Sequence, residues 1–255
     1  IQMKKEIHNI CLWNNGLNQQ SNLINNIKDI DIKILSVSNY ETSLDEDQIK
    51  ICKAIYYKSE TNFENKVNRC GFKNFTKIEI ELNCSKTNIE TTRGISQVSK
   101  EIFELKQKLR NELNIADLIH CTDTETESKL LDILLNAYFK KKDDKFLYTG
   151  IRKIEDVKEL LNNFFNYVVL RNFDSFYSNE KHGDVDILCD SRSQIIRLLG
   201  AESAKNSRSR ALFRIPNLEN NLYFDLREID ENYYPLTWQL DMLKNKIFDK
   251  DLNIY

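Results

Sequence analysis

The stretch Gly183-Asp184-Val185-Asp186-Ile187-Leu188 alternates acidic and apolar side chains. Successive side chains of a β-strand point to opposite faces, so Asp184 and Asp186 are expected on one face and Val185 and Ile187 in the core. Two neighbouring carboxylates repel each other unless a cation lies between them, and Mg²⁺ prefers oxygen ligands. The stretch therefore predicts a strand that carries a Mg²⁺ site.

A second alternating stretch, Tyr223-Phe224-Asp225-Leu226-Arg227, supplies a third acid. If this strand lies beside the first, the three carboxylates converge and hold up to two Mg²⁺ ions, about 3.5–4 Å apart, for in-line displacement at phosphorus. Arg227 shares the face of Asp225, where it binds a substrate phosphate or neutralises the acids. The alternative for Asp184 and Asp186 is an exposed edge strand with two solvated acids.

The order of these strands resembles the polymerase-beta-like nucleotidyltransferase superfamily over about Ile154–Phe248. The resemblance implies that Asp184, Asp186 and Asp225 are catalytic and bind two divalent metals, Asp225 as ligand or base.

The family's Gly-Ser phosphate-binding loop is missing from the corresponding stretch Tyr167–Asn172. We expect Arg171 with Asn172, or Ser175 and Ser178 in the following loop, to bind the substrate phosphates instead.

The segment Tyr233-Tyr234-Pro235-Leu236-Thr237-Trp238 also resembles bacterial nucleotidyltransferase-like proteins associated with surface-glycan assembly. That resemblance implies a sugar or polyol phosphate as the acceptor.

His120 ends an extended apolar piece and is followed by Cys121-Thr122-Asp123-Thr124, which can cap a helix over Thr124–Phe139. The amides at a helix start favour an anion such as phosphate. This arrangement resembles the nucleoside diphosphate kinase family over Lys4–Phe139. The resemblance implies a ferredoxin-like sandwich and phosphotransfer through a catalytic His120.

Two positions depart from that kinase family. Leu12-Trp13-Asn14-Asn15 stands where the family has Lys-Pro-Asp, and Asp117 stands near the place of an Asn that precedes the catalytic His. The alternative is therefore a retained fold that binds a ligand or supports the other domain.

Periodicity predicts an α/β (α+β) protein. A ferredoxin-like sandwich over residues 1–140 precedes a nucleotidyltransferase-like mixed sheet with helices over 146–255, and the charged run Lys140–Lys145 is the expected boundary. The expected strands are Lys4–Trp13, Ile32–Val37, Phe75–Leu82, Leu118–His120, Tyr167–Arg171, Asp184–Cys189, Ala211–Ile215 and Leu222–Arg227. The expected helices are Leu23–Ile30, Ser43–Tyr57, Ser96–Leu113, Thr124–Phe139, Ile154–Phe165, Ser191–Leu199 and Tyr233–Phe248.

The composition excludes some classes of protein and of binding partner. The 255 residues are 41% hydrophobic and 30% charged with a net charge of −2, which excludes a disordered chain and argues against nucleic acid as the partner.

No apolar run approaches the roughly 20 residues of a membrane span, and Ile1–Lys5 does not open a signal peptide, so a cytoplasmic location is expected. Six cysteines without a CxxC pair predict buried free thiols rather than a zinc finger. His182 is expected to be a loop residue and His8 a plain strand residue.

The sequence thus predicts a Mg²⁺-dependent nucleotidyl- or phosphoryl-transferase that uses a nucleotide donor. The alternatives are nucleoside diphosphate kinase-like transfer through His120 and a non-catalytic protein that binds a nucleotide or a partner.

Overall fold

A computed structural model describes residues 3–30, 32–59, 62–91, 94–172, 184–204, 211–219 and 221–255. The chain divides into two compact units. The first contains Ile1–Cys52 and Thr61–Tyr148, and the second contains Lys53–Glu60 and Thr149–Tyr255. Both are mixed assemblies of helices and sheets, which confirms the expected fold class.

The first unit is a sandwich on a six-stranded sheet of order β6-β1-β3-β2-β8-β7. Its strands are β1 (Lys4–Trp13), β2 (Lys33–Glu41), β3 (Asn74–Cys84), β6 (Ile119–Cys121), β7 (Phe139–Lys142) and β8 (Lys145–Tyr148), with β4 (Lys86–Thr91) and β5 (Gly94–Ser99) as a separate hairpin. Its helices are the 3₁₀ helix η1 (Asn14–Gln19), α1 (Gln20–Asp29), α3 (Phe63–Cys70), α4 (Lys100–Leu113) and α5 (Glu125–Tyr138). The helix α2 (Asp45–Ile55) begins in this unit and ends in the other.

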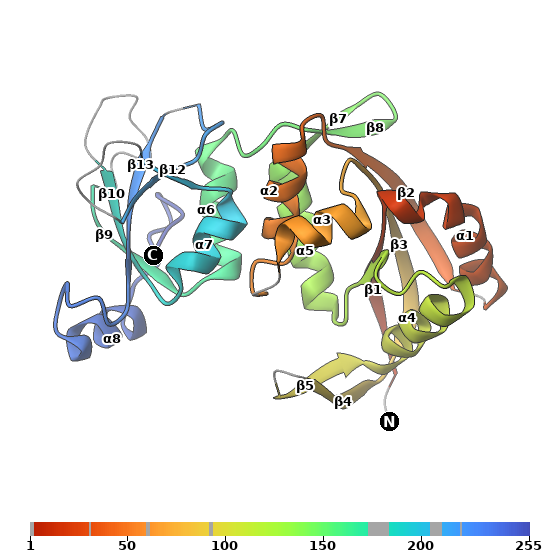
Figure 1. Cartoon of the computed structure of the whole chain (residues 1–255). Coiled ribbons are helices and arrows are strands. Elements are labelled where there is room, and N and C mark those ends of the chain that lie inside the picture. The colour runs from red at the N-terminus through yellow and green to blue at the C-terminus, as the bar shows by residue number, and fades with distance from the viewer. Residues whose placement is uncertain are drawn as a thin grey trace. The chain divides into compact units, whose positions relative to one another are not determined.

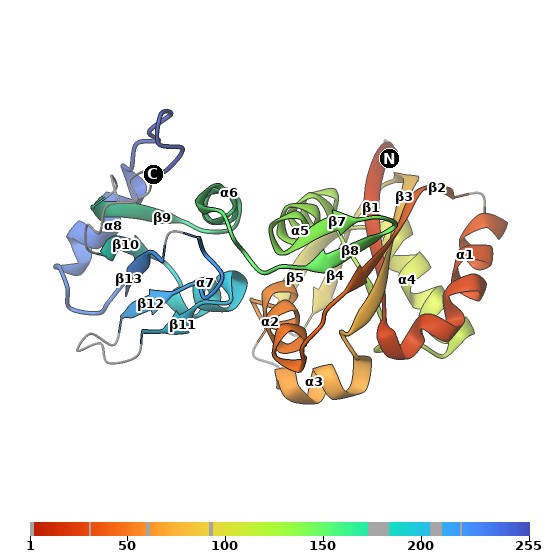
Figure 2. The ribbon, with the colours of Figure 1, turned by 90° about the horizontal axis from the view of Figure 1, so that it is seen from above.

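The order β1-α1-β2-β3-α4-β6, with neighbouring strands antiparallel, is the ferredoxin-like arrangement expected from the sequence. Figures 1 and 2 show α1 and α4 on one side of this sheet and α5 on the other. The core under α1 and α4 forms because alternate residues of β1 and β3 are apolar: Ile10, Leu12, Ile78 and Ile80 pack with Leu23, Ile27, Ile102, Leu105 and Leu109.

The sheet's other face holds an aromatic core. Tyr40 stacks on Phe75 with ring centroids 4.8 Å apart, and Phe139 and Phe146 lie 5.1 and 4.9 Å from Tyr40. Trp13 is fully buried beside Phe75. These large side chains bury enough apolar area to anchor α5.

The segment Lys140–Lys145 is not a linker. It spans the end of β7, the turn and the start of β8, and Asp143 at the turn has a positive φ of 55°. The unit boundary falls after Tyr148 instead. Apolar alternation is weak in this charged hairpin because three consecutive lysines are exposed, so composition alone indicated a domain boundary.

Other boundaries also shift. The helix expected from Ser96 begins at Lys100, because Gly94–Ser99 pair with β4 as a strand. The helix α3 was not expected; Asn62 caps it by accepting a hydrogen bond from the amide of Asn65.

The second unit is built on a five-stranded sheet of order β11-β12-β13-β10-β9. Its strands are β9 (Tyr167–Arg171), β10 (Asp184–Cys189), β11 (Glu202–Ser203), β12 (Leu212–Arg214) and β13 (Tyr223–Glu228). Its helices are α6 (Ile154–Phe164), α7 (Arg192–Leu199) and α8 (Leu236–Lys244). Helix α7 packs against β13, and α8 lies beside β9 and β10. Strands β12 and β13 are antiparallel.

All six cysteines are buried free thiols, as expected. Among the described residues, no helix has the length and apolar character that crossing a bilayer requires.

Gly71 closes α3 with φ 68° and ψ 132°, a conformation that L-residues rarely adopt. A Cβ there would lie 2.8 Å from Cβ of Asn14. We expect Gly71→Ala to lower the free energy of unfolding by about 1–3 kcal/mol, measured by urea denaturation. An unchanged midpoint with an unchanged slope would show that the turn relaxes without strain.

Candidate active site

The predicted carboxylates meet at the centre of the second unit's sheet. Strand β10 pairs in parallel with β13, which sets Asp186 directly opposite Asp225. On its other side β10 pairs antiparallel with β9, which sets Arg171 opposite Asp186. Residues directly opposite in a sheet share a face, so these three side chains form one row across three strands.

Asp186 and Asp225 are buried, with 1% and 5% of their surface exposed. Strand β10 lies between β13 and β9, so the alternative of an exposed edge strand is wrong. The sequence pattern did not predict this burial, because alternation alone assigns an acid to the solvent face.

Each buried carboxylate is half satisfied. Asp186 pairs through Oδ2 with Nε of Arg171, and Asp225 accepts through Oδ2 from Nη2 of Arg227 at 2.7 Å. The Oδ1 atoms of both have no hydrogen-bond partner within the described parts of the chain. A buried carboxylate oxygen without a partner is costly, which favours a cation at this point.

Asp184 completes the cluster. It precedes Asp186 by two residues and therefore lies on the same face of β10. One carboxylate oxygen from each of Asp184, Asp186 and Asp225 can be chosen so that all three lie within 4.8 Å of one another. Three converging carboxylates in which the buried members keep free oxygens form a suitable ligand set for a hard divalent cation.

The two arginines differ in solvent exposure. The side chain of Arg171 is 64% exposed at the end of β9, whereas that of Arg227 is 25% exposed. The guanidinium of Arg227 also lies 4.8 Å from the ring centroid of Tyr233, a cation–π contact that the sequence did not predict. Arg171 thus pairs with Asp186 from a solvent-exposed position, whereas Arg227 is packed between Asp225 and Tyr233.

Asn172 has a backbone role in this structure. Its φ is 60°, and its side-chain amide donates to the carbonyl of Asp184 at 2.7 Å, which ties the end of β9 to the start of β10. Ser175, Ser178 and His182, the other proposed loop residues, lie outside the described residues.

The structure places His120 in the first unit, on β6. It lies opposite Cys11 of β1, and its ring stacks on Trp13 with centroids 6.3 Å apart. Its side chain is 17% exposed. His120 and the three aspartates thus belong to separate units.

The start of α5 after His120 is already capped by side chains. Thr124 is the N-cap and accepts from the amide of Glu127 at 3.0 Å, while the Glu127 carboxylate accepts from the amide of Asp123 at 2.6 Å. This variant of the capping box, in which the glutamate bonds the amide before the N-cap, occupies the amides of Asp123 and Glu127. It also places a negative charge there, because the other Glu127 oxygen lies 3.7 Å from Nε2 of His120.

Burial, followed by the positive charges of Lys106, Lys66 and Arg110, lowers the pKa of His120 to about 3. The imidazole is therefore neutral at pH 7. Burial raises the pKa of the neighbouring Cys121 thiol to about 12, so this thiol is not an activated nucleophile.

Comparisons with known proteins find no matching family model and no matching curated protein. Among solved structures, a Borrelia burgdorferi nucleoside-diphosphate kinase with bound vanadate and ADP is 12% identical, with a TM-score of 0.32, over 49% of this chain and 83% of that one. An Aquifex aeolicus nucleoside diphosphate kinase is 9% identical, with a TM-score of 0.33, over 49% of this chain and 91% of that one. Similarity this low carries no argument about activity.

The lowered pKa of His120 has a consequence for stability. An unfolded histidine binds a proton below about pH 6.5, whereas folded His120 does not until about pH 3. The free energy of unfolding therefore falls as the pH drops through this window, by at most about 1.4 kcal/mol per pH unit. We expect His120→Gln to have a shallower loss between pH 6.5 and pH 4, measured by urea denaturation. A loss as steep as that of the parent chain would contradict the neutral assignment.

Proposed function

We propose that the second unit is a Mg²⁺-dependent transferase that moves a nucleotidyl or phosphoryl group from a nucleotide, with its active site at Asp184, Asp186 and Asp225. The observation that carries the proposal is the convergence of three carboxylates, two of them buried with one unpartnered oxygen each within the described residues. The resemblance of the strand order to nucleotidyltransferases points the same way.

The donor set fits Mg²⁺. Its ligands are all carboxylate oxygens, with no nitrogen or sulfur donor in the group. When bound, Mg²⁺ supplies charge that neutralises phosphate oxygens and orients them for displacement. Asp184 and Asp186 would hold the metal, and Asp225 would complete the ligand set or accept the proton of the attacking hydroxyl.

The arginines take part in different ways. Arg171 pairs with Asp186 from an exposed position, so it would be able to exchange this carboxylate for a phosphate of the donor nucleotide. Arg227 is held between Asp225 and the ring of Tyr233, and it would keep the carboxylate of Asp225 oriented. Asn172 would keep Asp184 in position through its backbone carbonyl.

The acceptor side is proposed to lie near Tyr233 and Tyr234. Gln239 is buried in α8, where it donates to the carbonyl of Tyr234 at 2.6 Å and accepts from the amide of Asp230 at 3.2 Å. This fixes the aromatic pair beside Arg227 and provides flat surfaces suited to a sugar. We propose a sugar or polyol phosphate as the acceptor, in keeping with a role in surface-glycan assembly.

We expect Asp186→Asn to reduce Mg²⁺-dependent turnover at least about 100-fold, because the charge that would hold the metal is lost while the shape is kept. The assay follows release of pyrophosphate or nucleoside diphosphate from a panel of nucleoside triphosphates, with sugar and polyol phosphates as acceptors.

Two matched controls locate the chemistry. Asp241→Asn changes an exposed acid on α8, and His120→Ala removes the histidine of the first unit; both should keep the parent rate. Activity that survives Asp186→Asn would refute the proposed site, and loss of an acid-labile phosphoryl label in His120→Ala would move the reaction to the first unit.

Asp184 offers a test without turnover. It adds a third negative charge beside Asp186 and Asp225, each of which already pairs with an arginine. We expect Asp184→Asn to stabilise the metal-free chain by about 1 kcal/mol, because it removes like-charge repulsion, and to abolish the stabilisation that Mg²⁺ gives the parent. Thermal unfolding with and without Mg²⁺ measures both effects. An equal Mg²⁺ shift in both chains would exclude Asp184 as a ligand.

A further inference from the structure

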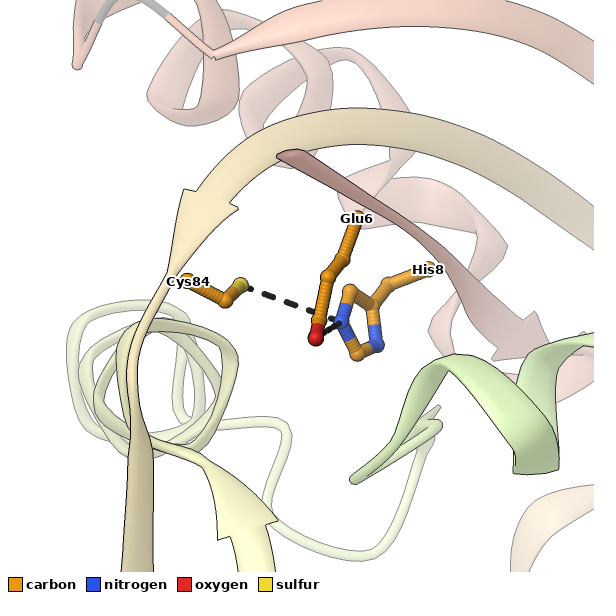
Figure 3. Close-up of side chains that lie close together, drawn as sticks. All are labelled: Glu6, His8 and Cys84. Atoms are coloured by element: carbon orange, nitrogen blue, oxygen red, sulfur yellow. Dashed lines mark hydrogen bonds and ion pairs between the residues drawn. The ribbon is translucent and has the colours of Figure 1, made fainter. Parts of the chain in front are cut away.

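Three buried side chains of different chemistry meet at one end of the first unit's core, under α4 (Figure 3). They are Glu6, His8 and Cys84, with 2%, 0% and 2% of their surfaces exposed. The strand register explains the meeting: Glu6 and His8 share a face of β1, and β3 pairs with β1 so that Cys84 lies opposite Lys4, on that same face.

Both ring nitrogens of His8 have polar neighbours. Its Nδ1 lies 3.1 Å from the carbonyl oxygen of Thr122 and 3.5 Å from the hydroxyl oxygen of the same residue. Its Nε2 lies 3.2 Å from Oε2 of Glu6 and 3.8 Å from Sγ of Cys84 (Figure 3). In metal-binding histidines, the ring nitrogen that does not bind the metal usually has a carbonyl or carboxylate beside it, and the Thr122 carbonyl lies in this place beside Nδ1 of His8.

The distances between the three ligand atoms are close to those between ligands of one tetrahedral metal ion. Tetrahedral zinc with bonds of about 2.0–2.1 Å to nitrogen and oxygen and about 2.3 Å to sulfur separates nitrogen from oxygen by about 3.4 Å and nitrogen from sulfur by about 3.6 Å. The observed values are 3.2 and 3.8 Å. The three ligand atoms all lie within 4.8 Å of one another.

A hydrogen bond and an ion pair hold the carboxylate of Glu6. Ser99, the residue before α4, donates to its Oε2 at 2.5 Å, and the ammonium of Lys86 lies 2.6 Å from Oε1. Ligating carboxylates are commonly oriented by such outer hydrogen bonds.

We propose that Glu6, His8 and Cys84 form a binding site for a divalent transition metal of the zinc class. The set combines one carboxylate oxygen, one imidazole nitrogen and one thiolate sulfur, which suits zinc and not Mg²⁺. On binding, the thiol proton of Cys84 and any proton on Nε2 of His8 pass to solvent as the metal–sulfur and metal–nitrogen bonds form. Three protein ligands leave the fourth tetrahedral position to water. The site lies in the first unit and does not depend on the transferase proposed for the second.

Cobalt(II) in the reduced full-length chain tests this site. It reports a metal–sulfur bond by a thiolate charge-transfer band and tetrahedral geometry by its visible bands. We expect both bands to saturate at one equivalent, and zinc to displace the cobalt. Cys84→Ala should lose the charge-transfer band and bind zinc at least about 100-fold more weakly.

Cys11→Ala is the matched control, because Cys11 is an equally buried thiol of the same unit outside the cluster. It should keep the band at full strength. His8→Gln keeps a donor for the Thr122 carbonyl but changes the ligand, so it should weaken binding without unfolding the chain, as checked by circular dichroism. The proposal is overturned if the parent chain binds no metal at one equivalent, or if Cys84→Ala keeps the band.

Discussion

The parallel pairing of β10 with β13 is the constraint on which the candidate active site depends. It sets Asp186 opposite Asp225, and the pairing with β9 adds Arg171 to the same row. A shift by one residue would turn every one of these side chains to the other face and bury polar groups in the core. Because Val185, Ile187, Phe224 and Leu226 are all buried, the core itself fixes the register that brings the carboxylates together.

The charges in this row are balanced and leave capacity for a cation. Arg171 and Arg227 pair with Oδ2 of Asp186 and of Asp225, respectively. The Oδ1 atom of each aspartate has no hydrogen-bond donor within the described residues. An ion pair that existed only for stability would satisfy both oxygens, since a half-satisfied buried network is costlier than an apolar core. The unequal exposure of Arg171 and Arg227 suits one movable and one fixed partner for a phosphate-bearing ligand.

Alternation predicted much of the fold because it directly reflects which face is buried. The bounds of β1, β9 and β10 were predicted to the residue, and the facing of Asp184 and Asp186 followed from the same rule. The hairpin at Lys140–Lys145 and the helix α3 were missed, since their turns and caps carry little apolar pattern. The cluster of Glu6, His8 and Cys84 could not be seen at all: Cys84 is far from the other two along the chain, and only strand register joins them.

The central claim is that Asp184, Asp186 and Asp225 bind a divalent cation together. Anomalous diffraction from crystals soaked in Mn²⁺, which takes the same oxygen ligands as Mg²⁺, tests it most directly. The account predicts an anomalous peak within bonding distance of all three carboxylates, with Arg171 moved away from Asp186. The claim is contradicted if crystals soaked with saturating Mn²⁺ and a nucleotide show no anomalous peak at the three carboxylates and Arg171 is still paired with Asp186.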